Sequence, residues 1–212
     1  MRKPELFRHV LDYFRQTMDD TETELNYSNP FELLVAVVLS AQCTDKRVNM
    51  ITPALFEKFP EAEDFARLTP EELEPYIYSA GFYKNKSKSI VAAAKSIVEN
   101  YGGNVPETVD ELKKLPGVGQ KTANVVYSVA FGGNAIAVDT HVFRVTRRLG
   151  IANGKTPEKT ELQLREFFPE KDWGKIHHQL IFLGRYRCKS QKPDCENCAL
   201  SGVCKYYEEN KR

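Results

Sequence analysis

The 212-residue sequence lacks several common patterns, and each absence excludes a class of protein. No apolar run approaches the roughly 20 residues that a membrane-spanning helix needs. No sustained alternation of polar and apolar residues indicates a β-strand, and no repeat, low-complexity segment or flexible linker is evident. The first residues contain no secretory hydrophobic segment, so we expect a cytoplasmic protein. Because no strand pattern is present, we expect an all-α fold.

Cysteine is scarce until the end of the chain, where Cys188, Cys195, Cys198 and Cys204 are separated by six, two and five residues. In a cytosolic protein this pattern indicates a metal centre rather than disulfides, because thiolates bind soft metals. Zinc sites more often combine two separated Cys-x-x-Cys pairs, and this chain has one such pair. The spacing therefore favours an iron–sulfur cluster, with zinc as the chemical alternative. Cys43 stands apart, as expected of a packing thiol.

The formal net charge of +1 is unevenly distributed. Residues 1–140 contain 15 Lys and Arg against 20 Asp and Glu, whereas residues 141–212 contain 15 against 9. The basic C-terminal part is suited to lie along a polyanion such as DNA.

Apolar residues three and four positions apart, together with capping residues, predict helices along most of the chain. Leu6, Val10, Leu11 and Phe14 form the apolar stripe of the first helix. Thr69 and Glu72 form a capping box with a proline between them. The expected helices cover residues 4–18, 30–41, 44–59, 85–100, 120–131, 139–149, 156–168 and 173–184, with shorter ones after residues 69 and 108.

Two glycines follow a proline in residues 115–124, which read LPGVGQKTAN, and the helix over residues 120–131 starts immediately after them. Because glycine adopts positive φ and carries no Cβ, Gly117 and Gly119 predict a tight hairpin whose backbone N–H groups can face a ligand. The unpaired amides at the start of the helix favour an anion such as phosphate. This helix–hairpin–helix pattern indicates binding to a nucleic-acid backbone without reading of the bases.

Lys121 lies in the first turn of the hairpin's second helix, where the helix dipole disfavours a positive charge and eases loss of the proton. A neutral amine is a nucleophile that forms Schiff bases with carbonyl carbons. Asp139 precedes another predicted helix, where its carboxylate can cap amides and still present a negative charge. Taken singly, such residues are more often a surface lysine and a simple cap. Their occurrence with the hairpin makes both candidate catalytic residues.

Residues 115–126, which read LPGVGQKTANVV, and 138–145, which read VDTHVFRV, resemble the signature of the endonuclease III family of DNA glycosylases and AP lyases. The resemblance covers about residues 30–204, and the cysteine spacing matches the [4Fe-4S] pattern of that family. It implies a two-domain all-α fold. A six-helix domain with the hairpin, residues 23–133, is inserted into an iron–sulfur cluster domain built from residues 1–22 and 134–212. Lys121 and Asp139 are then expected in the cleft between the domains.

The resemblance also assigns residues to DNA. Gln42 matches the family residue that fills the gap left by an extruded base, and Phe82 lies in the loop that wedges the opposite side. Ala80, Phe82 and Lys113 depart from the residue types expected at those positions. Gly117 and Gly119 are expected to grip a backbone phosphate. The cations around the first cysteine loop are expected to meet phosphates as well: Arg185, Arg187, Lys189 and Lys192.

These implications predict a base excision repair DNA glycosylase with AP lyase activity on duplex DNA that contains damaged pyrimidines or abasic sites. Lys121 is expected to form a Schiff base with the sugar, and Asp139 to stabilise the developing positive charge. We expect a monomer associated with the nucleoid. The alternatives are an adenine- or thymine-mismatch glycosylase of the same superfamily and, in another class, a non-catalytic DNA-binding or redox-sensing module. Lys121 argues against the adenine enzyme and the binding module, because neither needs this amine.

Overall fold

The computed structural model describes residues 3–210 as helices joined by loops, with no β-strand in that range. The all-α prediction is therefore confirmed. The described chain forms two compact units. One, called the hairpin unit below, is Glu24–Gly133; the other, called the cysteine unit, joins the described residues before Glu24 to those from Asn134 onward. Within residues 3–210, no helix combines the length and apolar character that crossing a bilayer requires.

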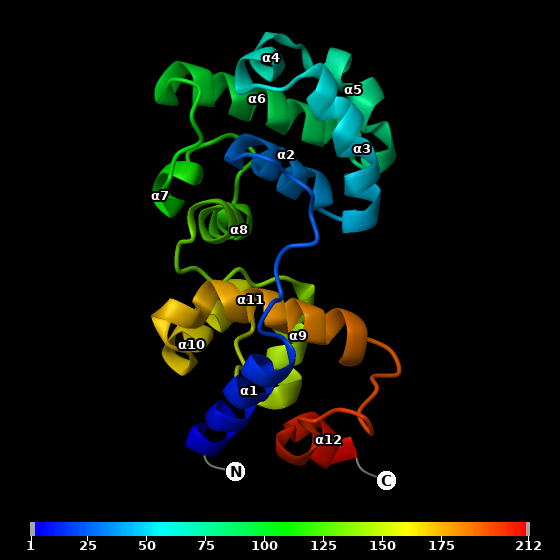
Figure 1. Ribbon diagram of the computed structural model, residues 1–212, viewed down its shortest axis with the longest axis vertical. Coiled ribbons are helices and arrows are strands. Elements are labelled where there is room, and N and C mark those ends of the chain that lie inside the picture. Colours follow the sequence, from blue (N-terminus) through cyan, green and yellow to red (C-terminus); the bar gives the residue numbers. More distant parts are fainter. Residues whose placement is uncertain (1–2, 211–212) are drawn as a thin grey trace. The chain divides into compact units, whose positions relative to one another are not determined.

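The hairpin unit is built around α2, which is apolar on nearly every side and buried along most of its length. It contacts α3, α6 and α8, and Figure 1 shows it lying between α6 and α8. Each fully buried Leu or Phe side chain contributes about 1.5–3 kcal/mol to folding. The helices of the unit are α2 (Pro30–Ser40), α3 (Asp45–Lys58), α4 (Ala62–Arg67), α5 (Pro70–Ile77), the 3₁₀ turn η1 (Tyr78–Ala80), α6 (Tyr83–Tyr101), α7 (Val109–Leu112) and α8 (Gln120–Phe131).

Side-chain caps fix where most of these helices begin. Asn29 Oδ1 accepts from Glu32 N at 2.9 Å and starts α2. Thr69 and Glu72 form the predicted capping box, in which Glu72 N donates to Thr69 Oγ1 at 3.3 Å and Thr69 N donates to Glu72 Oε2 at 2.8 Å. Such caps contribute about 1 kcal/mol each. In contrast, the N-cap of α8 is Gly119, which has no side chain to cap the first amides of the helix.

The cysteine unit has a core that both ends of the chain share. The predicted stripe Leu6, Val10, Leu11 and Phe14 is buried against side chains of α9, α10 and α11, among them Val145. The helices of the unit are α1 (Lys3–Thr17), α9 (Thr140–Leu149), α10 (Pro157–Phe167), the 3₁₀ turn η2 (Glu170–Asp172), α11 (Trp173–Phe182), the π-helical turn η3 (Leu183–Arg187), the 3₁₀ turn η4 (Ser201–Val203) and α12 (Lys205–Asn210).

The short elements that the apolar pattern did not predict include α4, α12 and η3. The first two have six residues each, too few for a periodic stripe to stand out. At η3 the helix widens after α11, and Cys188 N donates to Leu183 O at 2.7 Å. A π-helical turn often marks a functional segment. Here it delivers the chain to the first of the four clustered cysteines.

Candidate active site

The hairpin is the turn between α7 and α8, and its apolar residues anchor it. Leu115 and Val118 are buried, and Val118 N donates to Leu115 O at 3.1 Å. Gly117 has φ +77°, and a Cβ on it would lie 2.4 Å from Ser89 Cβ. Gly119 has φ −87° and is exposed, and apart from Gly119 itself and its two chain neighbours no described residue lies within 4 Å of where its Cβ would be. The fold therefore requires glycine at 117, whereas position 119 has room that a ligand can use.

Lys121 lies in the first turn of α8, two residues after Gly119, with its side chain exposed. The helical ladder begins where Ala123 N donates to Gly119 O at 2.9 Å, so the amides before Ala123 have no carbonyl within the helix. Gln120 Nε2 donates to the buried Asn124 Oδ1 at 2.8 Å and fixes the first turn. An exposed amine thus stands beside backbone amides that favour an anion.

Asp139 is the N-cap of α9 in the cysteine unit. Its Oδ1 accepts from Val142 N at 2.7 Å, and the side chain is half-buried. The cap fixes the carboxylate, and the second oxygen lies outside that hydrogen bond. The carboxylate is therefore both held in one orientation and able to present its charge.

His141 joins Asp139's helix to η3. Burial lowers the pKa of His141, Arg144 and Arg185 lower it further, and Asp139 raises it. The neutral ring accepts at Nδ1 from Arg144 Nη2 at 3.2 Å. Arg144 also donates to Gly184 O at 2.9 Å and to Cys188 O at 3.1 Å. His141 and Arg144 thus connect the start of α9 to the first cysteine, which is a structural role.

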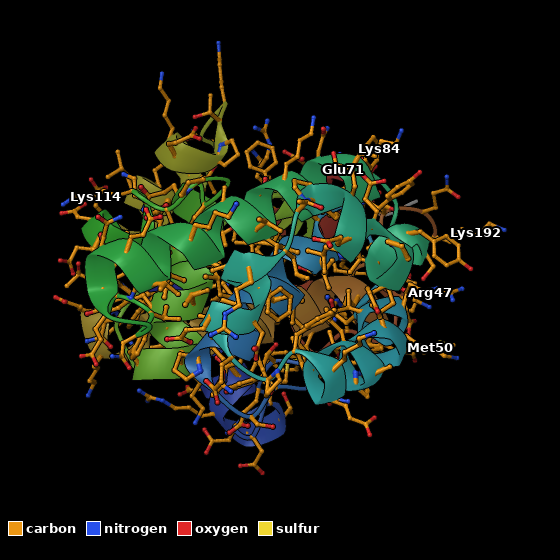
Figure 2. The ribbon with its side chains drawn as sticks, turned by 90° about the horizontal axis from the view of Figure 1, so that it is seen from above. Arg47, Met50, Glu71, Lys84, Lys114 and Lys192 are labelled. Carbon is orange, nitrogen blue, oxygen red and sulfur yellow. The ribbon has the colours of Figure 1, made fainter. Side chains whose placement is uncertain are left out.

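Two exposed turns of the hairpin unit adopt backbone conformations that are costly for their residue types. Gln42, between α2 and α3, has φ 53°, and Phe82, before α6, has φ 47°. For residues other than glycine this region costs about 1–2 kcal/mol. Phe82 is 64% exposed despite its apolar ring. Figure 2 shows Arg47 and Lys84, close in sequence to these turns, with exposed side chains that extend from the unit.

The four C-terminal cysteines line one cavity within the cysteine unit, together with apolar residues such as Leu149 and Leu183. Burial, and next the neighbouring sulfurs, raise the pKa of the Cys195 thiol. The Cys198 and Cys204 thiols also have a raised pKa, chiefly through burial. Among the described residues, no group of three or more His, Cys, Asp or Glu side chains is placed to hold a metal ion.

Arginines hold the loop between the first two of these cysteines. Arg148 donates to Lys189 O at 2.6 Å and to Ser190 O at 3.0 Å, and its Nη1 lies 3.5 Å from Cys188 Sγ. Its guanidinium lies 4.5 Å from the centre of the Tyr206 ring. Arg187 forms an ion pair with Asp194 inside the loop. The loop is therefore held by Arg148 of α9 and by the ion pair between Arg187 of η3 and Asp194.

The other predicted DNA contacts differ in exposure. Lys189 and Lys192 are exposed on the cysteine loop, and Lys192 has φ 46°. Arg185 is half-buried on η3 and lies close enough to His178 and His141 to lower their pKa values. Two lysines are thus directly available to a polyanion, whereas Arg185 and Arg187 also interact within the unit.

The chain from residue 35 to residue 170 matches the HhH-GPD superfamily of base excision DNA repair proteins. It is 53% identical over 196 residues to the endonuclease III of Bacillus subtilis, covering 92% of this chain and 90% of that protein. It is 42% identical to the endonuclease III of Escherichia coli, covering 94% of each chain. This chain belongs to the endonuclease III family. It is accordingly a base excision repair DNA glycosylase, as the resemblance to the signature of that family predicted.

Solved structures agree with this membership. A trapped covalent endonuclease III–DNA intermediate, described as an estranged-adenine complex, superposes with a TM-score of 0.95 at 46% identity and covers all of both chains. A non-covalent endonuclease III–DNA complex gives 0.93 at 46% identity, with 99% and 98% covered. A thermostable thymine-DNA glycosylase gives 0.82 at 24% identity, which shows the shared fold alone.

Sequence reasoning missed two residues that the structure connects to the candidate site. Lys86 is buried in α6 and donates to carbonyls beside the Gln42 and Phe82 turns. A signal was present, because Lys86 lies four residues before the buried Ile90 and so occupies an apolar stripe. Arg148 had no comparable signal, since its partners are backbone oxygens about 40 residues away.

Proposed function

We propose that this member of the endonuclease III family removes damaged pyrimidines from duplex DNA and then cuts the strand by β-elimination, with Lys121 as the nucleophile. One observation carries the proposal: an exposed amine in the first turn of α8, beside backbone amides that no side chain caps. The trapped covalent DNA intermediate of a similar endonuclease III supports it, because a covalent intermediate needs a nucleophile.

In this proposal each of the two units supplies one of the two catalytic groups. The six-helix domain, residues 23–133, supplies Lys121, and the iron–sulfur cluster domain, residues 1–22 and 134–212, supplies Asp139. The hairpin amides at Gly117 and Gly119 bind a backbone phosphate. Gln42 and Phe82, which have positive φ in their turns, insert into the duplex. Their side chains fill the gap that the extruded base leaves in the stack. The cations that meet further phosphates are Arg185, Arg187, Lys189 and Lys192.

The chemistry follows from an amine and a carboxylate. The neutral Lys121 nitrogen attacks C1′, and the C1′–N bond to the base breaks with its electron pair leaving on the base, which takes up a proton. Opening of the C1′–O4′ bond gives a protonated Schiff base. Asp139 stabilises the positive charge that develops on the sugar and accepts the proton lost by the amine. Loss of a C2′ proton then expels the 3′ phosphate, and water hydrolyses the Schiff base to release the enzyme.

The proposal includes a [4Fe-4S] cluster held by the four C-terminal cysteines. Cys188, Cys195, Cys198 and Cys204 line one apolar space, and Arg148 Nη1 lies 3.5 Å from a sulfur, as a donor to a metal-bound thiolate would. A bound cluster would supply a rigid cross-link that holds the loop with Lys189 and Lys192. The proposal includes a monomer that works at the nucleoid, where its substrate lies.

Iron and sulfide analysis of anaerobically purified protein tests the cluster. We expect four irons and four sulfides per chain, together with visible absorption, as the proposed cluster requires. Cys198→Ser should lower the iron content and the absorption, whereas Cys43→Ser should leave both unchanged, because Cys43 belongs to the other unit. Stoichiometric zinc without sulfide would contradict the cluster.

Strand cleavage of a duplex that carries one thymine glycol tests the function. Wild type should release the base and cut 3′ to the lesion, and Lys121→Ala should do neither. Lys114→Ala is the matched control, because Lys114 is an exposed lysine of the same hairpin region, labelled in Figure 2. Cleavage by Lys121→Ala at the wild-type rate would refute the nucleophile, and base release without cleavage by wild type would favour a mismatch-type monofunctional glycosylase.

A further inference from the structure

Lys86 has an unusual environment for a lysine in a small helical unit. It is 6% exposed, and its Nζ donates to Leu39 O and to Ala80 O, each at 2.8 Å. The first carbonyl lies in the last turn of α2 and the second ends η1. Carbonyls at helix ends lack partners within the helix and carry the negative end of its dipole, so one ammonium satisfies two such ends.

Each carbonyl lies two or three residues before one of the two non-glycine residues of the unit that have positive φ. Gln42 follows Leu39 by three residues, and Phe82 follows Ala80 by two. Lys86 N also donates to Phe82 O at 3.1 Å, so the same residue anchors the Phe82 turn through its backbone. Residues held in such conformations persist only where the surrounding structure fixes them. Lys86 is the described side chain that hydrogen-bonds to both segments.

We propose that Lys86 is a positioning residue that couples the two DNA-inserting turns, holding Gln42 and Phe82 at a fixed separation so that both enter the duplex together. The inference rests on the insertion roles under the proposed function and adds the device that sets their spacing. A hydrogen-bonding cation suits the task, because two buried carbonyls left unpaired would let either turn shift. Lysine also places its charge at a single point between the two oxygens.

The position of Lys86 makes a specific kinetic prediction. Opening a duplex needs both turns, whereas an abasic site in single-stranded DNA presents its sugar without any base to extrude. Lys86→Met keeps the stem but removes the donors. It should lower the single-turnover rate on a thymine glycol duplex by about 100-fold, the loss expected from a displacement of about 1 Å in positioning groups. The rate of β-elimination on a single-stranded abasic oligonucleotide should stay near that of wild type.

Ser87→Ala is the matched control for a general weakening of α6. Ser87 is fully buried in the same turn, and its Oγ donates to Lys84 O at 3.0 Å, within α6, whereas Lys86 Nζ donates to Leu39 O and Ala80 O. Ser87→Ala should lower the rate on the thymine glycol duplex by no larger a factor than the rate on the single-stranded abasic oligonucleotide. If Lys86→Met does not fold, Lys86→Gln replaces it with the same expected result, since its shorter stem withdraws the donors from the two carbonyls while the side chain stays polar.

A mutant cycle separates this inference from the proposed function. Lys86→Met and the pair Gln42→Ala with Phe82→Ala are measured alone and together on the thymine glycol duplex. If Lys86 acts through the turns, Lys86→Met should lower the rate little further in the protein that already carries Gln42→Ala and Phe82→Ala. An unchanged effect of Lys86→Met in that background, or an equal loss on single-stranded DNA, would overturn the positioning role alone. A wild-type rate for the Gln42→Ala, Phe82→Ala protein would overturn the insertion roles and the coupling with them.

Discussion

The hairpin unit and the cysteine unit hold their functional groups in place by different means. In the hairpin unit the groups stand at helix ends and tight turns: Lys121 at the uncapped start of α8, and Gln42 and Phe82 at positive φ. In the cysteine unit, arginine side chains bind the backbone of the loop that carries Lys189 and Lys192. The strained turns therefore fix the positions of single side chains, whereas the guanidinium contacts hold a whole loop that has little regular secondary structure.

The largest expected effect tests whether the cysteine unit also contributes to the chemistry. Asp139→Asn keeps a side-chain oxygen that caps α9, because asparagine is as good an N-cap as aspartate. It removes the negative charge, so the glycosylase rate should fall about 100- to 1,000-fold while the melting temperature and DNA affinity stay near those of wild type. Single-turnover kinetics beside calorimetry measures both. Wild-type turnover would restrict Asp139 to its cap.

The next largest effect is a pH dependence of stability that His178 gives to the cysteine unit. Burial, and then Arg185, lower the pKa of His178 from 6.5 to about 4. Between these values the unfolded chain binds more protons than the folded protein, so the free energy of unfolding falls as the pH is lowered from 6.5 towards 4. The loss should reach at most about 3 kcal/mol. Urea unfolding across this range should show it in wild type and less of it in His178→Gln. Identical slopes would contradict a neutral, half-buried His178.

A smaller effect tests the guanidinium contacts directly. Arg148→Met leaves Lys189 O and Ser190 O without their donors and should lower stability by about 2 kcal/mol, with faster proteolysis between residues 185 and 204. Arg147→Met is the comparison, because Arg147 is exposed and donates to one carbonyl, Gly154 O at 3.0 Å. Equal effects of the two substitutions in denaturant titration would show that Arg148 has no special part in the loop.

The smallest effect contrasts two glycines of the hairpin. Gly119→Ala has room and an ordinary φ, so the lost N-cap preference is offset by a stiffer unfolded chain, and stability should change by less than about 0.5 kcal/mol. DNA affinity should still fall about fivefold, because a methyl group would stand beside the amides that meet phosphate. Gly117→Ala should instead destabilise the fold, since its φ is +77°. Unchanged affinity in Gly119→Ala would place the phosphate elsewhere.

Local patterns predicted much of this molecule, and long-range contacts account for what they missed. The stripe Leu6 to Phe14, the Thr69 capping box and the helix after Gly119 follow from the chemistry of neighbouring residues, and each is present. The link from Lys86 to Leu39 spans 47 residues, and that from Arg148 to Lys189 spans 41. Their acceptors are backbone oxygens, which every residue carries, so no residue type marks them in the sequence.

The residues of the candidate site stay predictions. Lys121, Asp139 and the cysteines were recognisable because their spacing resembles a family signature, and family membership is shown by the comparisons. The positive φ of Gln42 and Phe82 could not be predicted, because asparagine and glycine, rather than these residues, favour that conformation. Such conformations arise from the surrounding packing, which only the folded structure displays.

The central claim is that one amine, Lys121, performs the covalent step. Borohydride reduction of wild type with a duplex carrying one thymine glycol, followed by protease digestion and mass mapping of the adduct, tests it most directly. We expect a sugar-derived mass on the peptide that contains Lys121, and no adduct from Lys121→Ala. An adduct mapped to another lysine, or base release by wild type without any adduct, would contradict the claim.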